Sequence, residues 1–511
     1  MNKKQNWMFL FLLTIFIVIV RLPGLDEPLD NDSGANAFFS RQMLRGEILY
    51  DKYHPTHHLP GIYYTFVAAF KLFGDTPIAP KLFLLPWMLL CAWLVYRMGQ
   101  LYLNDLSGIL GAVFFILVSS QVSMKGTTAE MEQFANLPLT AGVFLSISLL
   151  RSRAQAWKYI WVGLIGAICM LYKVTFIAPL AVVGLAIFAM AWMERGKITF
   201  LKTVLPPLAW MFIGFVIPVA AVGYYFASLG LWERFILVFR IGFAYVQTSN
   251  SMFPYLPPPF GFPLVWMAVS NVALLMFGLI GVYRCARHSF PFHGIEPLTN
   301  FMLSLWFVIS FAEAGLRGGG WEHYALLVVP PLSLMGAYEI SVAYKRWKIQ
   351  GSEKKARIGA SIMTALIVLI FVVLDYDFYS HYVAYKLGSI SRDDFILGYT
   401  GTSGTGPHAL NAEKIGYYIQ AHTTPDDLIY LATPYVQSYY YAGRNPPVDM
   451  IWPVYLFVTG SGERIFDPRV QYIVFDPEKE GRPRWLIDGL KRYFYLETMF
   501  GDQEIYHRIS Q

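Results

Sequence analysis

Eleven apolar segments of roughly membrane-spanning length constrain this chain more than any other feature of its sequence. A helix that crosses a bilayer needs about 20 mostly apolar residues, and the composition agrees, since 56% of the 511 residues are hydrophobic and only 14% are charged. Soluble domains carry about 25% charged residues. The sequence therefore predicts a polytopic α-helical membrane protein. The expected spans are residues 7–22, 82–98, 107–122, 134–150, 158–172, 175–193, 204–227, 262–283, 299–314, 324–343 and 359–375.

The first of these segments follows two lysines, as the apolar part of a signal peptide would. The residues after it are Arg21, Leu22 and Pro23, with no cleavage site of small residues, so we expect a retained helix. The three cysteines lie in or beside apolar segments and form no disulfide framework.

Lysine and arginine collect in alternate loops, which fixes a predicted orientation because such loops stay in the cytoplasm. With the N-terminus inside, the outer connections carry far fewer basic residues, notably Lys125, Lys173 and Arg317. The excess of basic residues thus reflects which loops lie in the cytoplasm. It does not indicate a nucleic-acid partner. An odd number of spans places the C-terminal part of the chain outside the cytoplasm.

One further apolar stretch, residues 61–74, is a candidate span. If it crossed the membrane, every later loop would lie on the opposite side from the one that its basic residues indicate. We therefore predict a helix that lies at the outer interface, where Tyr and Phe are favoured. It belongs to a long first outside loop, residues 23–81. A second interface helix is predicted at 232–247.

The chain changes character after residue 375, which suggests a membrane domain, 1–375, followed by an outside α/β domain, 376–511. β-branched and aromatic residues between turn signals predict strands in this tail. The Gly/Thr/Ser stretch at 398–407 predicts a linker or mobile loop. Helices are expected at 412–422 and 484–494, and strands at 426–433, 470–476 and 504–510.

Ionisable side chains gather in three of the outside loops, and such groups are functional candidates because they are costly at membrane depth. All three loops lie on the same predicted side as the tail, so we expect them to meet in one pocket. The candidates are Asp32, Tyr53, His57 and His58 in the first loop, Glu130 and Glu132 in the second, and Glu322, His323 and Tyr324 in the third.

Structural roles compete with these functional ones. Asp32 precedes a predicted surface helix and is a candidate N-cap. The two glutamates of the second loop are candidate first-turn acids, stabilised by the helix dipole. The paired histidines of the first loop have no third metal ligand spaced nearby, and a histidine at a helix start, such as His323, is commonly a hydrogen-bonded structural residue.

Taken in order, four stretches resemble the GT-C class of membrane glycosyltransferases, and within it the bacterial relatives of protein O-mannosyltransferases and lipid A aminoarabinose transferases. They are "DSGANAFFSRQMLRGEILY", "HHLPGIYY", "EQFANLP" and "HYALLVVPP". The resemblance covers residues 5 to 345 and, weakly, the tail. It places the family's first acid on Asp32 and favours Glu132 over Glu130 for the second. The family's usual Glu after the first acid is Ser33 here, so that residue's role is not carried over.

The resemblance implies sugar transfer from a polyprenyl-phosphate donor to an acceptor outside the cytoplasm, which could be a lipid, a glycan or a protein. Nucleotide sugars are confined to the cytoplasm, so outside chemistry needs a sugar carried on a membrane lipid. Our hypothesis is an inverting displacement in which Asp32 acts as general base. The protein would then act at the plasma membrane, in contact with membrane lipids, with its site on the extracytoplasmic side.

Other outside residues would assist this reaction. Lys173 and Arg317 are candidates to offset the charge of the leaving phosphate, whereas Arg240 more simply snorkels to the interface. Glu132 and His323 would orient the acceptor or hold a divalent metal ion, and the need for that ion stays open. The helix at 232–247 would guide the lipid tail.

Two other functions compete with this one. A transporter or flippase of lipid-linked sugars would bind head groups without chemistry, and it would carry ionisable groups inside its spans and paired hydrophobic halves. The sequence shows few charges inside its spans and no such symmetry, which disfavours this function. A polysaccharide polymerase or ligase would show its large outside loop late in the chain. Release of free lipid phosphate by the pure protein separates enzyme from transporter.

Overall fold

The computed structural model describes residues 3–193, 197–248, 261–290, 294–316, 320–402, 404–453, 462–477 and 484–509. Its contacts divide the chain into two units. The membrane unit comprises residues 1–22, 82–230 and 242–376, and the mixed unit comprises 23–81, 231–241 and 377–511.

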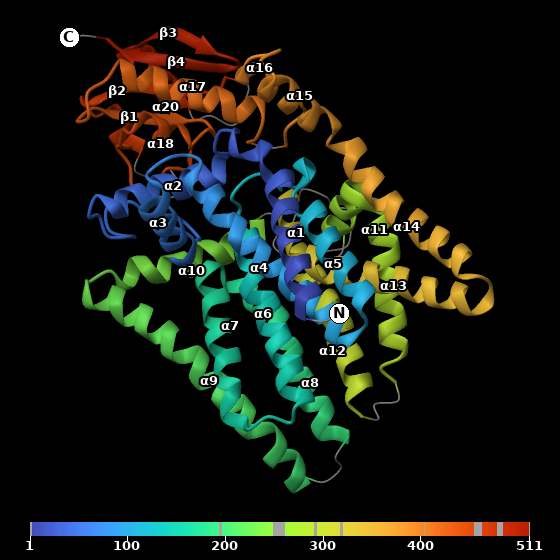
Figure 1. Ribbon diagram of the computed structural model, residues 1–511. Coiled ribbons are helices and arrows are strands. Elements are labelled where there is room, and N and C mark those ends of the chain that lie inside the picture. The colour runs from blue at the N-terminus through green and yellow to red at the C-terminus, as the bar shows by residue number, and fades with distance from the viewer. Residues whose placement is uncertain are drawn as a thin grey trace. The chain divides into compact units, whose positions relative to one another are not determined.

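Long helices make up the membrane unit (Figure 1). Among the described residues, nine helices are long and apolar enough to cross a membrane, and two of the predicted spans correspond to the shorter apolar helices α5 and Ala156–Tyr172. Every predicted span thus overlaps a helix, although the one at 107–122 runs past the end of α5 at Val118, and the polytopic fold is confirmed. The helices are α1 (Lys3–Arg21), α4 (Ala79–Tyr102), α5 (Asp105–Val118), α6 (Met131–Arg151), α7 (Ile160–Tyr172), α8 (Ala181–Met193), α9 (Lys197–Ser228), α11 (Gly261–Arg287), α12 (Ile295–Leu316), α13 (Val329–Gln350) and α14 (Glu353–Leu374).

Burial separates the inner helices of this unit from the outer ones. The span formed by Glu322–Gln350 is 89% buried in its apolar window, whereas α1 and α14 are each 17% buried. The outer helices expose large apolar side chains, among them Phe212 and Val373. Because a soluble protein rarely exposes so much apolar surface, these faces are the ones that lipid covers.

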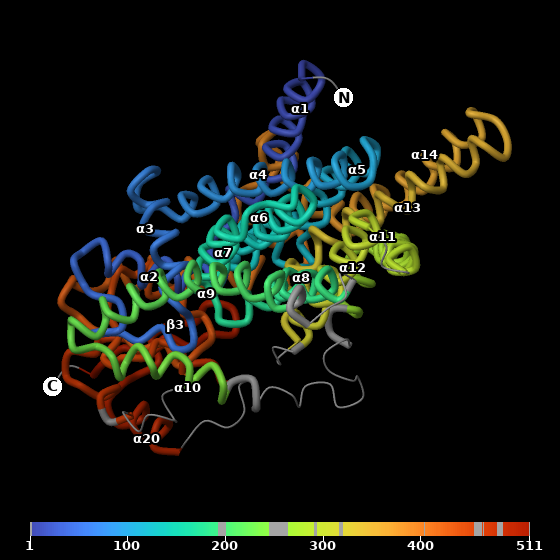
Figure 2. The backbone as a smooth tube through the Cα atoms, turned by 90° about the horizontal axis from the view of Figure 1, so that it is seen from below, coloured from blue at the N-terminus to red at the C-terminus, as the bar shows by residue number. Residues whose placement is uncertain are grey.

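Glycine lets neighbouring helices of the membrane unit approach closely. A Cβ on Gly163 of α7 would lie 2.0 Å from the carbonyl oxygen of Met211 in α9, and one on Gly214 would lie 2.1 Å from that of Ile160. Such small-residue contacts are typical of helix packing in membranes. In another part of the unit, α13 and α14 form a helical hairpin (Figures 1 and 2).

The mixed unit combines the first outside loop with the tail. Its apolar helix α3 has 13 residues, about 20 Å at 1.5 Å per residue, and like α5 it is shorter than the hydrocarbon core of about 30 Å. The loop contains η1 (Pro23–Leu25), α2 (Asn31–Leu44) and α3 (Gly61–Phe73), and α10 (Trp232–Thr248) begins in this unit. The interface location of α3 and α10 stays a prediction.

The tail folds around a four-stranded sheet of order β1-β2-β4-β3, with α17 and α20 packed beside the strands (Figure 1). β1 and β2 are parallel and the other two pairs are antiparallel. Its core includes Val470 and Ile473 of β2 and Leu486 and Leu490 of α20. The elements are α15 (Tyr376–Lys386), α16 (Arg392–Leu397), α17 (Pro407–Ala421), β1 (Leu428–Ala432), α18 (Ser438–Ala442), β2 (Val470–Phe475), α20 (Arg484–Tyr493), β3 (Phe494–Phe500) and β4 (Gln503–Arg508).

The α/β character of the tail is therefore confirmed, and all five of its predicted elements are present. The sequence missed β3, an edge strand whose exposed Tyr495, Leu496 and Met499 do not follow a period of two. The predicted division of the chain into a membrane domain, 1–375, and a tail domain, 376–511, stays a prediction.

Candidate functional site

A tight loop before α6 carries the first ionisable pair of the membrane unit. Lys125 has φ +53°, in the left-handed region, and its N–H donates to the Val122 carbonyl at 3.0 Å. At the end of α1, the Arg21 guanidinium donates to the Thr128 carbonyl at 3.0 Å. The loop is thus anchored at both ends, which fixes the direction of the residues between them.

Lys125 and Glu130 form an ion pair in this loop, with 3.7 Å between the ammonium nitrogen and the carboxylate oxygen. Their side chains are 1% and 3% exposed. Glu130 is the N-cap residue of α6, but its side chain makes no capping hydrogen bond. A buried pair of charges is costly to desolvate, so a pair retained here without a capping role is a functional candidate.

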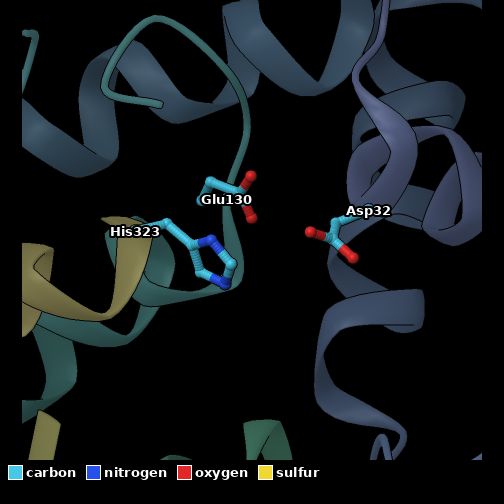
Figure 3. A group of neighbouring side chains, drawn as sticks. All are labelled: Asp32, Glu130 and His323. Carbon is cyan, nitrogen blue, oxygen red and sulfur yellow. The ribbon is translucent and has the colours of Figure 1, made fainter. Parts of the chain in front are cut away.

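His323 lies beside this pair on the 3-10 helix η6 (Glu322–Val328). A ring nitrogen of His323 and a carboxylate oxygen of Glu130 lie within 4.8 Å of each other, and Figure 3 shows the two side chains next to one another. Carboxylate and imidazole are both ligands of zinc-like divalent ions. Two side chains of the membrane unit therefore meet the first requirement for a metal site.

Lys173 and Tyr324 add a second cation and a hydroxyl to the membrane unit. The Lys173 ammonium nitrogen lies 4.5 Å from the centroid of the Tyr324 ring and 3.5 Å from its hydroxyl oxygen. The ring of Tyr324 in turn packs edge-on against His323, with centroids 4.6 Å apart. Lysine over an aromatic face is a favourable cation–π arrangement, and Lys173 as a whole residue is half-buried.

The other acids of these two loops are buried as well. Glu132, in the first turn of α6, is 1% exposed, and Glu322 is 3% exposed. One turn after Glu132, the Asn136 amide donates to the Leu326 carbonyl at 3.0 Å and ties α6 to η6. Of the two glutamates in the second loop, Glu130 is the one beside His323, whereas the resemblance favours Glu132, whose role stays a prediction.

Asp32, also drawn in Figure 3, belongs to the mixed unit. The capping interpretation of Asp32 is wrong: Asp30 is the N-cap of α2, and its carboxylate accepts from the Ser33 N–H at 3.1 Å. Asp32 is half-buried in the first turn. There the helix dipole stabilises its carboxylate as an anion, which is the form a general base needs.

The paired histidines of the first loop lie beside α3. The rings of His57 and His58 lie 4.4 Å apart, and the Tyr63 hydroxyl is 3.3 Å from Nδ1 of His58. Burial raises the pKa of Tyr63 well above its usual value, and electrostatic interaction with Tyr50 and Asp32 raises it further.

Tyr53 packs edge-on against Phe38 at 5.6 Å and is 6% exposed, a packing role that the sequence does not distinguish from binding. Arg240 is exposed on α10, and Arg317 lies outside the described residues.

Sequence reasoning missed a buried histidine in the first loop. His54 is 0% exposed. Its Nδ1 accepts from the Thr56 N–H at 3.1 Å, and Nε2 donates to the Arg234 carbonyl at 2.8 Å. Burial lowers its pKa to about 4. In the sequence, only the His-Pro pair within a polar loop pointed to His54.

A buried lysine was missed too. The Lys81 ammonium group, 1% exposed, donates to the carbonyls of Gly24 and Glu27 at 2.8 and 2.6 Å. It holds the segment that leads into α2. In the sequence, a lysine near the start of an apolar helix is typical of an ordinary interface residue. The sequence pattern therefore did not indicate that Lys81 is buried and hydrogen-bonded.

Several solved glycosyltransferases share this fold. ArnT from Cupriavidus metallidurans bound to undecaprenyl phosphate superposes with a TM-score of 0.64 at 14% identity, over 98% of both chains. An oligosaccharyltransferase from Archaeoglobus fulgidus, tethered to an acceptor peptide, gives 0.55 at 13% identity, over 100% of this chain and 74% of its own. The mycobacterial arabinofuranosyltransferase AftD gives 0.50 at 12% identity, over 100% of this chain and 40% of its own.

These structures are GT-C glycosyltransferases, so the resemblance stated from the sequence is confirmed at the level of the fold. No protein-family model matches the chain, and no curated protein matches it in sequence.

Proposed function

We propose that the protein is a glycosyltransferase that moves a sugar from a polyprenyl-phosphate donor to an acceptor outside the cytoplasm, either a lipid, a glycan or a protein. The observation that carries this proposal is the group of buried ionisable side chains in the membrane unit: Lys125 paired with Glu130, and Glu130 beside His323. A similar fold is found in ArnT bound to undecaprenyl phosphate, which supports the donor class.

In the proposed reaction Asp32 is the general base. Its carboxylate takes the proton of the acceptor hydroxyl or amine while the acceptor atom forms a bond to the anomeric carbon. The bond from that carbon to the phosphate oxygen breaks on the opposite face, and the lipid phosphate leaves with the electron pair. The configuration at the anomeric carbon is therefore inverted.

The leaving phosphate gains negative charge, which cations at the site would stabilise. Lys173 is a half-buried residue, and Lys125 is held in the anchored loop before α6. We assign both to the phosphate, together with Arg317. Glu130 and His323 would hold a divalent ion, which, when bound, supplies further positive charge to the phosphate oxygens.

The proposal requires Asp32 to work beside the Glu130 loop, and the covalent chain permits this. Arg21 is hydrogen-bonded to Thr128, two residues before Glu130. Asp32 follows Arg21 by 11 residues, which can span at most about 40 Å when fully extended. The order of the four family-like stretches supports the same convergence.

The test is turnover by the purified full-length protein with a polyprenyl-phosphate sugar, read as release of free polyprenyl phosphate. Asp32→Asn should lower the rate by about 10²- to 10⁴-fold, the usual contribution of a positioned general base. Asp30→Asn is the matched control, because asparagine keeps the helix cap and should keep the rate. Full activity of Asp32→Asn would remove Asp32 from the mechanism.

The same assay separates the proposed enzyme from a transporter. A transporter would move the intact lipid-linked sugar across a vesicle membrane and release no lipid phosphate. Movement of the lipid without release, under conditions where the wild-type protein is folded, would contradict the enzyme proposal.

A further inference from the structure

A buried polar cluster lies in the membrane unit where α14 ends. Asp375 is the C-cap residue of α14 and is 2% exposed. Its Oδ1 accepts from the N–H of Val122 at 3.1 Å. The neighbouring residues Ser120 and Gln121, which follow α5, are 1% and 0% exposed. An aspartate thus sits against the loop that leads to Lys125 and Glu130.

Several oxygens in this cluster have no hydrogen-bond partner among the described residues. They are Oδ2 of Asp375, Oε1 of Gln121 and Oγ of Ser120. The orientation of the Gln121 amide is fixed, because its nitrogen donates to the Ser270 carbonyl at 2.7 Å. Buried oxygens without donors cost free energy, so a positively charged or hydrogen-donating species is expected beside them.

A break in α11 adds more oxygen to the same place. The backbone of Asn271 is not helical, with φ −161° and ψ 82°. In a continuous helix the Leu274 N–H would donate to the Ser270 carbonyl; instead it donates to Oδ1 of Asn271 at 2.9 Å. The Ser270 carbonyl is thereby released to Gln121, and the Ser270 hydroxyl lies 2.9 Å from that of Ser123.

The electrostatics of this cluster favour a cation. Two helices end here, α14 at Asp375 and the first half of α11 at Ser270, and a helix carries partial negative charge at its C-terminal end. A carboxylate at such an end is unfavourable when, as here, no described residue offers it a basic partner. Ends of broken helices in membrane proteins commonly coordinate small cations for this reason.

The geometry points to a binding site for a monovalent cation of the sodium type at Asp375, Gln121, Ser120 and Ser270. A single carboxylate balances one positive charge, whereas a divalent ion would leave a net charge buried in an apolar unit. The ligands are all oxygens, as hard cations prefer. The site is separate from Glu130 and His323 and does not depend on the proposed sugar transfer.

Such a cation would join the end of α14 to the loop that follows α5. The first leads into the mixed unit at residue 377, and the second carries Lys125 and Glu130. Bound cation should therefore order both segments. The expected effect is local stabilisation, which can be measured without knowing the substrate.

The experiment is hydrogen exchange of the full-length protein in detergent, in sodium chloride and in choline chloride at equal ionic strength. Sodium should slow exchange of the amides at 119–124 and at the end of α14, by about tenfold at ten times the dissociation constant. Peptides of α17 serve as the internal control and should not respond. Equal exchange in the two salts would overturn the proposal.

Substitutions test which side chain coordinates the cation. Asp375→Asn keeps an oxygen for the Val122 N–H and removes the charge, so sodium should no longer slow exchange. Glu353→Gln, at the exposed start of the same helix, should keep the full response. Should Asp375→Asn fail to fold, Ser120→Ala is the milder variant and should weaken the response.

Two further outcomes would contradict a sodium-type site. Protection that follows pH equally in both salts would show that Asp375 holds a proton instead. Protection by magnesium chloride but not by sodium chloride would show a divalent site.

Discussion

At the scale of single residues, the buried charged side chains are the feature that packing of apolar helices does not explain. The Lys125–Glu130 pair lies 3.7 Å apart with both side chains almost fully buried. Breaking a buried pair by removing one partner leaves the other charge uncompensated, which costs about 3–5 kcal/mol. Replacing both partners avoids that penalty.

This asymmetry gives a prediction for Lys125 and Glu130. Lys125→Met alone should destabilise the protein by a few kcal/mol, whereas Lys125→Met with Glu130→Gln should recover much of the loss. Thermal unfolding of the two variants in detergent measures the difference. Additive losses would show that the two side chains act independently.

His54 gives a prediction about pH. Its pKa in the folded protein is lowered to about 4 by burial, against an ordinary value of about 6.5. The unfolded chain therefore binds a proton first as pH falls, and stability is lost between about pH 6.5 and pH 4. The loss approaches about 3 kcal/mol at the lower limit.

The measurement is the free energy of unfolding at pH 7 and pH 5 for the wild-type protein and for two variants. His54→Gln should flatten the pH dependence, because glutamine does not titrate. His422→Gln, which replaces an exposed histidine on the same unit, should keep the wild-type dependence. An unchanged slope in His54→Gln would assign the acid sensitivity to other groups.

At the scale of elements, close helix crossings depend on individual glycines. A Cβ at Gly163 would lie 2.0 Å from a backbone oxygen, whereas one at Gly184 of α8 has nothing within 4 Å. The first substitution forces α7 and α9 apart, and the second does not. Overpacking of this kind typically costs about 1–3 kcal/mol.

Gly163→Ala should therefore lower the melting temperature of the purified protein, and Gly184→Ala should leave it unchanged or raise it slightly, since alanine favours helix over glycine. Differential scanning fluorimetry in one detergent compares the two. Equal melting temperatures would mean that α9 moves aside without cost.

At the scale of the whole molecule, the central prediction is sidedness. Basic loops indicate a cytoplasmic N-terminus and a tail on the outside. The native cysteines are all buried, so an introduced cysteine is a clean probe. Ser389 follows α15 in the tail, Ser352 lies between α13 and α14, and both are exposed.

A membrane-impermeant maleimide added to intact cells should label Ser389→Cys and should not label Ser352→Cys until the cells are opened. The opposite labelling would reverse the orientation and place the proposed site in the cytoplasm, where lipid-carried sugars would not be required.

The sequence by itself determined the spans and five elements of the tail, because apolar length and alternation are properties of neighbouring residues along the chain. The sequence also indicated Asp32, Glu130 and His323 as candidate site residues, because they lie in outside loops and in stretches that follow the order of the family's motifs. Local pattern could not decide which aspartate caps α2, since Asp30 and Asp32 both suit a helix start.

Only the tertiary structure decided which distant groups meet. Glu130 and His323 are 193 residues apart in the chain, and Asp375 reaches Val122 over 253. Nothing in a stretch of ten or twenty residues records such a contact, because it is set by how helices pack and where one of them breaks. The burial of Lys81 and Lys125 and the break in α11 at Asn271 likewise depend on helix packing, so only the tertiary structure shows them.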